Sequence, residues 1–434
     1  MSGISVPTRD SLIDSLRRAN RATLLSLPLQ AILVLLLAGY AIDWSLVKSE
    51  PFMSVVVAFI MIGPTLFGLA RLAAQNKKEI TKLRDGAKIG NFTKPELIAL
   101  ARDVERTLGI GKSRVFITGE KDLNAAAIQV GLGSIFPSLN AIYLNRAALH
   151  CLNRDEMATV IGHELAHVAR HYLLWDKLLF LRMVGFILIG LYARQYFHGN
   201  DTFEVMGPVF IGGALQFLSG MYRGRFAHTL EYLCDDAGAV VAGIVPAIRA
   251  ELKIAARSEA YQSLFRRALR QKLDSGSFSL KELQKTLEEA LPYGGIDEAQ
   301  LQKELDRRFA ENKRAKETFS LKGFLQFLDI YESIETREKL RQQLDGLEAL
   351  VTLPRLDIPP TLPNDGTLAD FDHLVKQIEA EPNKVLFHLE GEIEDMSSSH
   401  PGARKRIVYL YRNREAIERE RGKQLAMRGA RSNP

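Results

Sequence analysis

The chain has 434 residues, of which 47% are hydrophobic and 25% charged, and its formal net charge is +6. These proportions are ordinary for a globular chain, and the length predicts two or three domains. Two cysteines, Cys151 and Cys234, imply no disulfide framework. The basic residues gather beside apolar segments and near the C-terminus, without an aromatic-studded basic motif, so no nucleic-acid partner is expected.

Two uncharged apolar segments, 22–42 and 52–70, lie near the start of the chain. Each is about 20 residues long, enough to cross the roughly 30 Å core of a bilayer. The loop between them is short, so we predict a membrane hairpin within an N-terminal anchor, residues 1–88. A cleaved signal peptide is the competing interpretation, but the first segment is too long and no small-residue cleavage site precedes the second.

Basic side chains flank this hairpin on both outer sides, whereas the loop between the segments is mildly acidic. By the positive-inside rule, both ends of the hairpin lie in the cytoplasm. We therefore expect an integral membrane protein in contact with the lipid bilayer, with the following domain on the cytoplasmic side of the membrane (the inner membrane if the cell is bacterial).

The central domain is expected at residues 89–245 and holds the most informative motif, His163-Glu164-Leu165-Ala166-His167. Asn153 and Glu156 have the spacing of a capping box, and no proline interrupts 153–175, so this stretch is predicted to be one helix. Histidines four apart share a helix face and can both reach one Zn²⁺. Glu164 is placed to accept a proton from water at such a site.

A catalytic zinc needs a third protein ligand and an open position. His171 lies about 12 Å along the helix from His163, too far to share the ion, and is expected at the surface or behind the ligands. Glu231 is the favoured third ligand, with Asp235 four residues on supporting a ligand histidine. His228 is the competing third ligand, and Asp236 is a weaker candidate.

Further segments complete the predicted organisation. An apolar hairpin, 178–222, interrupts the central domain and either spans the membrane or is buried in the protein. Short strands are predicted at 114–119 and 141–145. Residues 246–366 form a charged helical insertion with a proline-rich linker, and 367–434 complete the catalytic domain and end in a basic tail.

Three separated blocks resemble the HtpX-type membrane zinc metalloproteases, relatives of the zinc-dependent CAAX prenyl proteases. The first block is 163–167, and the second is Glu231-Tyr232-Leu233-Cys234-Asp235-Asp236-Ala237. In the second block, Cys234 stands where the family usually has alanine. The third block is Ser398-Ser399-His400-Pro401 followed by Arg406-Ile407. The resemblance covers roughly residues 90–245 and 395–412.

The resemblance implies one Zn²⁺ per chain on His163, His167 and Glu231, with Glu164 as the base. It implies that Asp235 supports the site, and that His400 and Arg406 lie near the catalytic centre, stabilising the oxyanion or holding the wall of the site. It also implies that Asn124 and Ala125 begin an edge strand on which substrate lies extended; a turn is the alternative for Asn124.

The expected fold is therefore α+β and mainly helical: a zincin-like (gluzincin) catalytic domain with a small β-sheet, plus transmembrane helices. The expected function is a membrane-anchored zinc metalloendopeptidase that cleaves proteins or peptides, such as misfolded membrane proteins, in quality control. One alternative is a CAAX-type protease that processes prenylated proteins. The other is an inactive membrane scaffold with a structural zinc, for which His228 could supply a fourth ligand.

Overall fold

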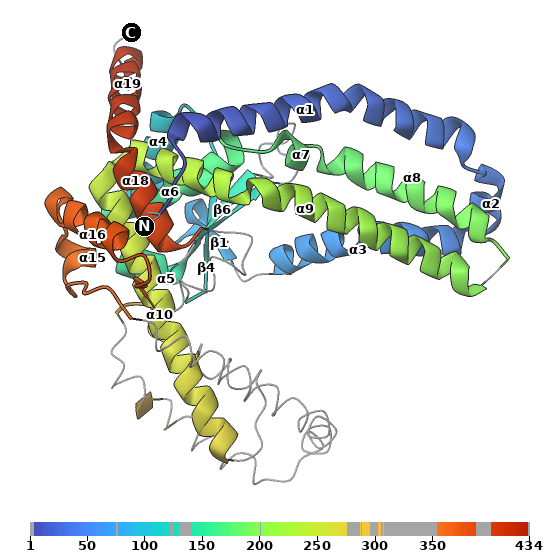
Figure 1. The fold of residues 1–434 in the computed structure, drawn as a ribbon. Helices are drawn as coiled ribbons and strands as arrows, with labels where there is room; N and C mark the ends of the chain where they lie inside the picture. Colours follow the sequence, from blue (N-terminus) through green and yellow to red (C-terminus); the bar gives the residue numbers. More distant parts are fainter. Residues whose placement is uncertain are drawn as a thin grey trace.

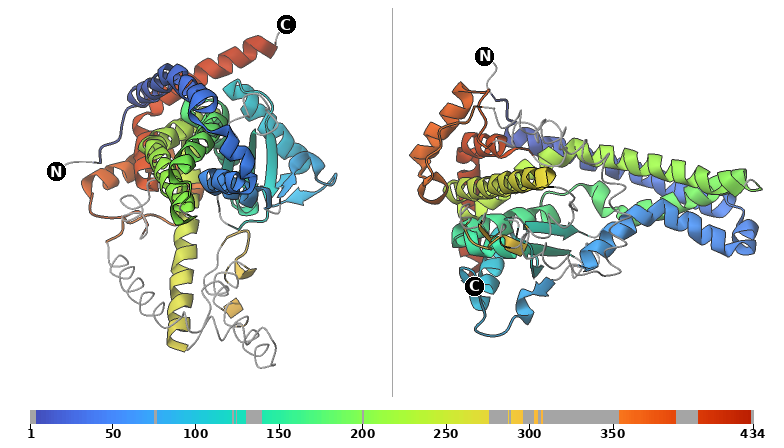
Figure 2. Two further views of the ribbon diagram at one scale, coloured as in Figure 1. Left: turned by 90° about the vertical axis from the view of Figure 1, so that its right-hand side faces the viewer. Right: turned by 90° about the horizontal axis from the view of Figure 1, so that it is seen from below.

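The computed structural model describes residues 4–74, 77–121, 123, 125–129, 140–199, 201–275, 287, 289–295, 303–304, 307, 354–387 and 401–432. Four long helices extend from a globular head as an arm (Figures 1 and 2). The head holds the small sheet and the short helices. The prediction of a mainly helical α+β fold with helices able to cross a membrane is confirmed.

The arm is apolar on its outside as well as in its interior. Three of its helices are long and apolar enough to cross a membrane, and α3 carries a shorter apolar stretch. Leu25, Phe52 and Phe217 are 81%, 75% and 68% exposed, as expected of side chains that face lipid. The elements of the arm are α1 (Arg9–Leu36), η1 (Leu37–Ala41), α2 (Trp44–Ser49), α3 (Pro51–Ala74), α8 (Leu179–Phe197) and α9 (Asp201–Ala242).

The predicted segments 22–42, 52–70 and 178–222 lie along these helices, apart from Ile42, Leu178 and the residues between α8 and α9. Helix α9 differs from the expectation in one respect that matters for the site. It does not end with the apolar hairpin but continues without a break into the head, as far as Ala242. One helix therefore carries both an apolar arm segment and the block that contains Glu231.

A four-stranded sheet forms one layer of the head, in the order β1-β4-β6-β5. Strands β4 and β6 are parallel, with Val115 opposite Ile142, and β5 runs antiparallel to β6 at the edge. Both predicted strands are confirmed, as β4 and β6. The strands are β1 (Lys77–Glu79), β4 (Arg114–Thr118), β5 (Ala125–Gln129) and β6 (Asn140–Asn145), with a separate pair β2 (Lys88–Ile89) and β3 (Phe92–Thr93).

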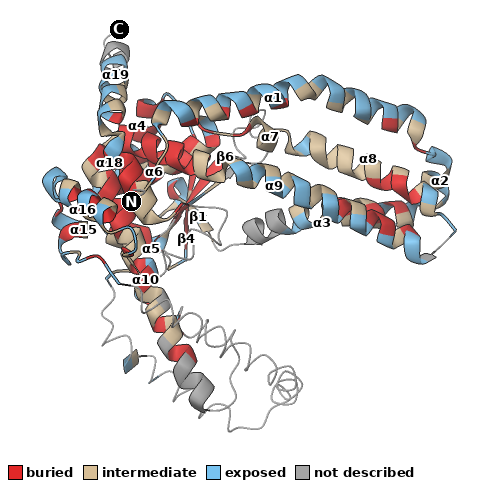
Figure 3. Cartoon of the chain, in the orientation of Figure 1, coloured by how far each residue is buried: buried red, intermediate tan, exposed pale blue. Residues whose placement is uncertain are grey.

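Helix α6 (Arg154–Ala169) packs on this sheet and is buried over most of its length (Figure 3). The predicted capping box is confirmed, because Asn153 and Glu156 bond each other's backbone N–H groups. The helix was expected to reach Trp175 but ends at Ala169. The side chain of Asn20 accepts from the N–H of Leu174 and donates to the carbonyl of Tyr172, so these backbone groups are satisfied without a continuation of α6.

The C-terminal segment packs against α9 and α10. Leu233 of α9, Ile248 of α10, Phe371 of α16 and Tyr409 of α18 belong to one core, and all four are fully buried. The remaining elements of the chain are η2 (Ile80–Lys82), α4 (Lys94–Leu108), α5 (Arg146–Cys151), α7 (Leu174–Lys177), α10 (Ile244–Ser275), α15 (Leu362–Asp365), α16 (Leu368–Ala380), α18 (Ala403–Arg412) and α19 (Arg414–Ser432).

Candidate metal centre

Two glycines allow α6 and α9 to pack with their backbones nearly in contact. A Cβ atom added to Gly162 would lie 3.1 Å from the Cα of Gly238, and one added to Gly238 would lie 2.6 Å from the carbonyl oxygen of Thr159. Only glycine has the size that this crossing permits. His163 follows Gly162 directly, and Asp235 lies one turn before Gly238, so the crossing brings both sequence motifs together.

Three potential ligand atoms converge beside the crossing. The Nε2 atoms of His163 and His167 lie 3.1 Å apart. The two carboxylate oxygens of Glu231 lie 3.5 Å from Nε2 of His163 and 3.4 Å from Nε2 of His167. A tetrahedral zinc with bonds of about 2.0–2.1 Å separates its ligand atoms by about 3.3–3.4 Å. The donor types and spacings therefore fit a zinc ion.

The third ligand candidate is thus Glu231 rather than His228. Among the described residues, His163, His167 and Glu231 form a group with mutual distances within 4.8 Å, and His228 is not part of it. Asp236 is also turned elsewhere, because both of its oxygens accept from Nε of Arg9 at 3.0 Å. The group has three protein ligands, the number that a catalytic zinc site uses.

Asp235 contacts one of the two candidate ligand histidines. Its Oδ1 lies 2.8 Å from Nδ1 of His163, so that a proton on Nδ1 completes this hydrogen bond and Nε2 is the nitrogen free to bind a metal. Burial alone would lower the pKa of His163, but the hydrogen bonds with Asp235 and Glu231 raise it well above its usual value. The same negative surroundings favour a bound cation.

Arg406 stands behind Asp235. Its Nε donates to Oδ2 at 2.7 Å, a terminal nitrogen donates to Oδ1, and the other terminal nitrogen pairs with Glu251 at 2.8 Å. Burial would lower the pKa of Arg406, but the charges of Asp235 and Glu251 raise it well above its usual value. The guanidinium of Arg406 is thus held between Asp235 and Glu251.

Glu251 is a member of this cluster that the sequence did not indicate. It lies on α10, is 7% exposed and belongs to no motif, so only the packing of α10 against α18 reveals it. Burial, the largest effect, raises the pKa of its carboxyl to about 7 although Arg406 opposes this.

The other predicted residues lie as follows. Glu164 is buried in α6, 7% exposed, and Cys234 is fully buried in the core, as a packing residue is. Ala125 is the first residue of the edge strand β5. Asn124 and His400 lie outside the described residues. His171 is buried at 9% exposure rather than on the surface, because the chain turns after Ala169.

Comparison with known proteins adds a family to this geometry. The model of "Peptidase family M48" matches residues 92–413, which are 322 of the 434 residues. The chain is similar to proteins named "Protease HtpX homolog" from three organisms. The protein from Thermococcus kodakarensis is 25% identical over 36% of this chain and 54% of the relative, and that from Pyrococcus abyssi is 27% identical over 34% of this chain and 52% of the relative. The protein from Lactobacillus acidophilus is 26% identical over 55% of this chain and 83% of the relative. The chain spans about half the length of the first two relatives. No solved structure matches it.

Proposed function

The chain belongs to peptidase family M48, and from this membership we propose that it is a membrane-anchored, zinc-dependent endopeptidase. One observation carries the proposal: the Nε2 atoms of His163 and His167 and the carboxylate of Glu231 converge from two helices. The His163–His167 motif by itself puts the two imidazoles on one helix, α6. The approach of α9 supplies the carboxylate.

His163, His167 and Glu231 would hold the zinc. When bound, zinc polarises a carbonyl and lowers the pKa of a coordinated water to about 7. The carboxylate of Glu164 accepts the proton of the attacking water and delivers it to the leaving amine. Asp235 keeps the proton of His163 on Nδ1, and Arg406 and Glu251 hold Asp235 in place. In this scheme Arg406 is a positioning residue rather than an oxyanion ligand.

The edge strand gives the substrate a place to bind. Strand β5 pairs with β6 on one side and is the last strand of the sheet on the other. An extended peptide can add to such an edge through main-chain hydrogen bonds. We propose that Ala125 and the rest of β5 bind the substrate backbone in this way.

The arm would anchor the catalytic head at the cytoplasmic face of the membrane. This orientation rests on the basic residues that flank the first two apolar segments. Membrane proteins that have misfolded are the substrates that such a placement favours, since their unfolded segments emerge beside the head.

Neither alternative function gains an observation in its favour. Side chains of the arm fill the space between its helices: Met61 is fully buried and Leu188 is 7% exposed, in a shared core, so the described helices form a packed bundle and not a chamber. A structural zinc needs four protein ligands, whereas the group found among the described residues has three.

A Glu164→Gln variant of the full chain tests the proposal. We expect it to bind one zinc per chain, as the wild type does, and to lose cleavage of casein and of a denatured membrane protein. Asp155→Asn is the matched control, because Asp155 is an exposed carboxylate in the first turn of the same helix. Undiminished cleavage by Glu164→Gln, or wild-type activity after full removal of zinc by a chelator, would contradict the scheme.

A further inference from the structure

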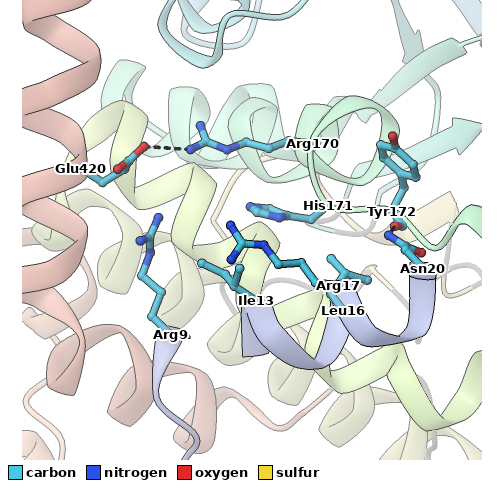
Figure 4. Close-up of a pocket in the computed structure, with 9 residues that line it drawn as sticks. All are labelled: Arg9, Ile13, Leu16, Arg17, Asn20, Arg170, His171, Tyr172 and Glu420. Carbon is cyan, nitrogen blue, oxygen red and sulfur yellow. Dashed lines mark hydrogen bonds and ion pairs between the residues drawn. The ribbon is translucent and has the colours of Figure 1, made fainter. Parts of the chain in front are cut away.

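A polar pocket that is separate from the candidate metal ligands lies where α1, the turn after α6 and α19 meet. It has a volume of about 430 Å³ (Figure 4). Three arginines line it, Arg9, Arg17 and Arg170, together with His171 and the carboxylate of Glu420. None of the proposed metal ligands lines this pocket.

The arginines of the pocket have more N–H groups than the nearby carboxylates can accept. Arg9 uses only Nε to bind Asp236, and Arg170 uses one terminal nitrogen to bind Glu420 at 3.1 Å. Within the described part of the chain, Arg17 pairs with Asp14 at 3.6 Å, and because both side chains are more than 60% exposed, this pair is weak. The carboxylates therefore hold two guanidinium groups in place while other donors stay without a described partner.

His171 provides the second, independent indication of a ligand. Its side chain is buried, 9% exposed, and its Nε2 has no hydrogen-bond partner among the described residues. Burial, Arg170 and Arg9 lower its pKa to about 3, so the ring is neutral and carries one N–H donor. In Figure 4 the imidazole lies between Arg170 and Arg17. When Nε2 carries the ring proton, this N–H needs an acceptor that the described residues do not supply.

We propose that this pocket binds a phosphate group, and that the phosphate belongs to the headgroup of a membrane lipid. Guanidinium groups match the geometry of phosphate oxygens through paired hydrogen bonds. Arg17 and His171 are the residues best placed to hold it, because neither has a strong partner in the described structure.

The position of the pocket along α1 favours a lipid as the source. Arg17 precedes the uncharged segment 22–42 by five residues, a rise of about 7–8 Å along the helix. This is about the thickness of the headgroup layer outside the hydrocarbon core. Further along the same helix, Leu25 and Leu29 are 81% and 70% exposed, where the acyl chains of that lipid would lie.

Binding to the purified full chain in neutral detergent tests the proposal. Native mass spectrometry would measure the binding of phosphatidylglycerol, with diacylglycerol as a probe that lacks the phosphate. Titration calorimetry would measure the binding of inorganic phosphate. We expect one tightly bound phosphatidylglycerol per chain and no comparable binding of diacylglycerol.

The variants isolate the pocket from general charge. Arg17→Gln and His171→Leu should each weaken the binding of phosphatidylglycerol about tenfold, the loss expected for one hydrogen bond to a charged group. Arg18→Gln removes the same charge from the next, exposed position of α1, outside the pocket, and should change binding less than twofold. Because Arg17 is exposed, its replacement leaves the core intact.

Each outcome decides the proposal. The phosphate site is supported if inorganic phosphate binds the wild type and binds Arg17→Gln about tenfold more weakly. If phosphatidylglycerol fails to bind in the same experiments, the site is assigned to a soluble phosphate ligand and not to a lipid. Equal binding of phosphatidylglycerol and diacylglycerol overturns the proposal, as does an equal effect of Arg17→Gln and Arg18→Gln. Proteolysis is not a readout, so failure here is distinct from failure of the proposed peptidase function.

Discussion

Asp235→Asn should weaken metal binding without preventing it. In the wild type, Oδ1 of Asp235 accepts from Nδ1 of His163 at 2.8 Å, and Arg406 donates to both carboxylate oxygens. An asparagine has one oxygen and one NH₂ group, so three donors would face a single acceptor oxygen. The negative charge that stabilises the metal-binding form of His163 would also be lost.

The expected loss of zinc affinity is about 10–100-fold, the usual effect of removing a group that orients a metal ligand. This corresponds to about 1.4–2.8 kcal/mol of binding free energy. Competition between the protein and a fluorescent zinc chelator measures the affinity, and thermal unfolding confirms that the variant is folded under the same conditions.

Asp236→Asn is the matched control for this experiment. Asp236 is the next residue of α9 and is equally buried, but its carboxylate binds Arg9 and not a metal ligand. Its replacement should lower the free energy of unfolding while leaving zinc affinity within about threefold, since it removes no bond to a ligand. Equal losses of zinc affinity in the two variants would refute the role assigned to Asp235.

Three further outcomes are expected. Gly238→Ala should lower the free energy of unfolding by about 1–3 kcal/mol, because its Cβ would meet the carbonyl of Thr159 at 2.6 Å. Gly224 has open space around it, so Gly224→Ala should be neutral or slightly stabilising when both variants are compared by thermal unfolding. Burial lowers the pKa of His171 to about 3, below its ordinary value of 6.5, so the unfolded chain binds more protons than the folded chain between these pH values. The free energy of unfolding therefore decreases as the pH falls through that window, by up to about 1.4 kcal/mol per pH unit. Between pH 7 and 5, the melting temperature of His171→Leu should depend less on pH than that of the wild type. Zinc at 100 times its Kd should raise the free energy of unfolding by about 2.7 kcal/mol, a gain that a chelator removes and that Glu231→Gln should lack.

The sequence by itself determined the features that depend on neighbours along the chain. The capping box of Asn153 and Glu156, the two histidines one turn apart and the lengths of the apolar segments follow from helix geometry and the thickness of a bilayer. The alternation of apolar residues was likewise sufficient to locate β4 and β6.

Only the tertiary structure decided how distant segments meet. The choice among Glu231, His228 and Asp236 depends on where α9 crosses α6, and that crossing is set by the contact between Gly162 and Gly238. The course of the chain after α6 involves an amide far away in the sequence, because Asn20 of α1 bonds the carbonyl of Tyr172 and the N–H of Leu174, where α7 begins.

The support behind the metal centre is of the same kind. Arg406 and Glu251 are 155 positions apart in the sequence, yet their side chains pair at 2.8 Å behind Asp235. No local pattern marks Glu251, because its role arises only when α10 and α18 pack together and bury both charges. Charge pairing across a core is a property of packing, and packing between distant helices is what periodicity and motif spacing leave undetermined.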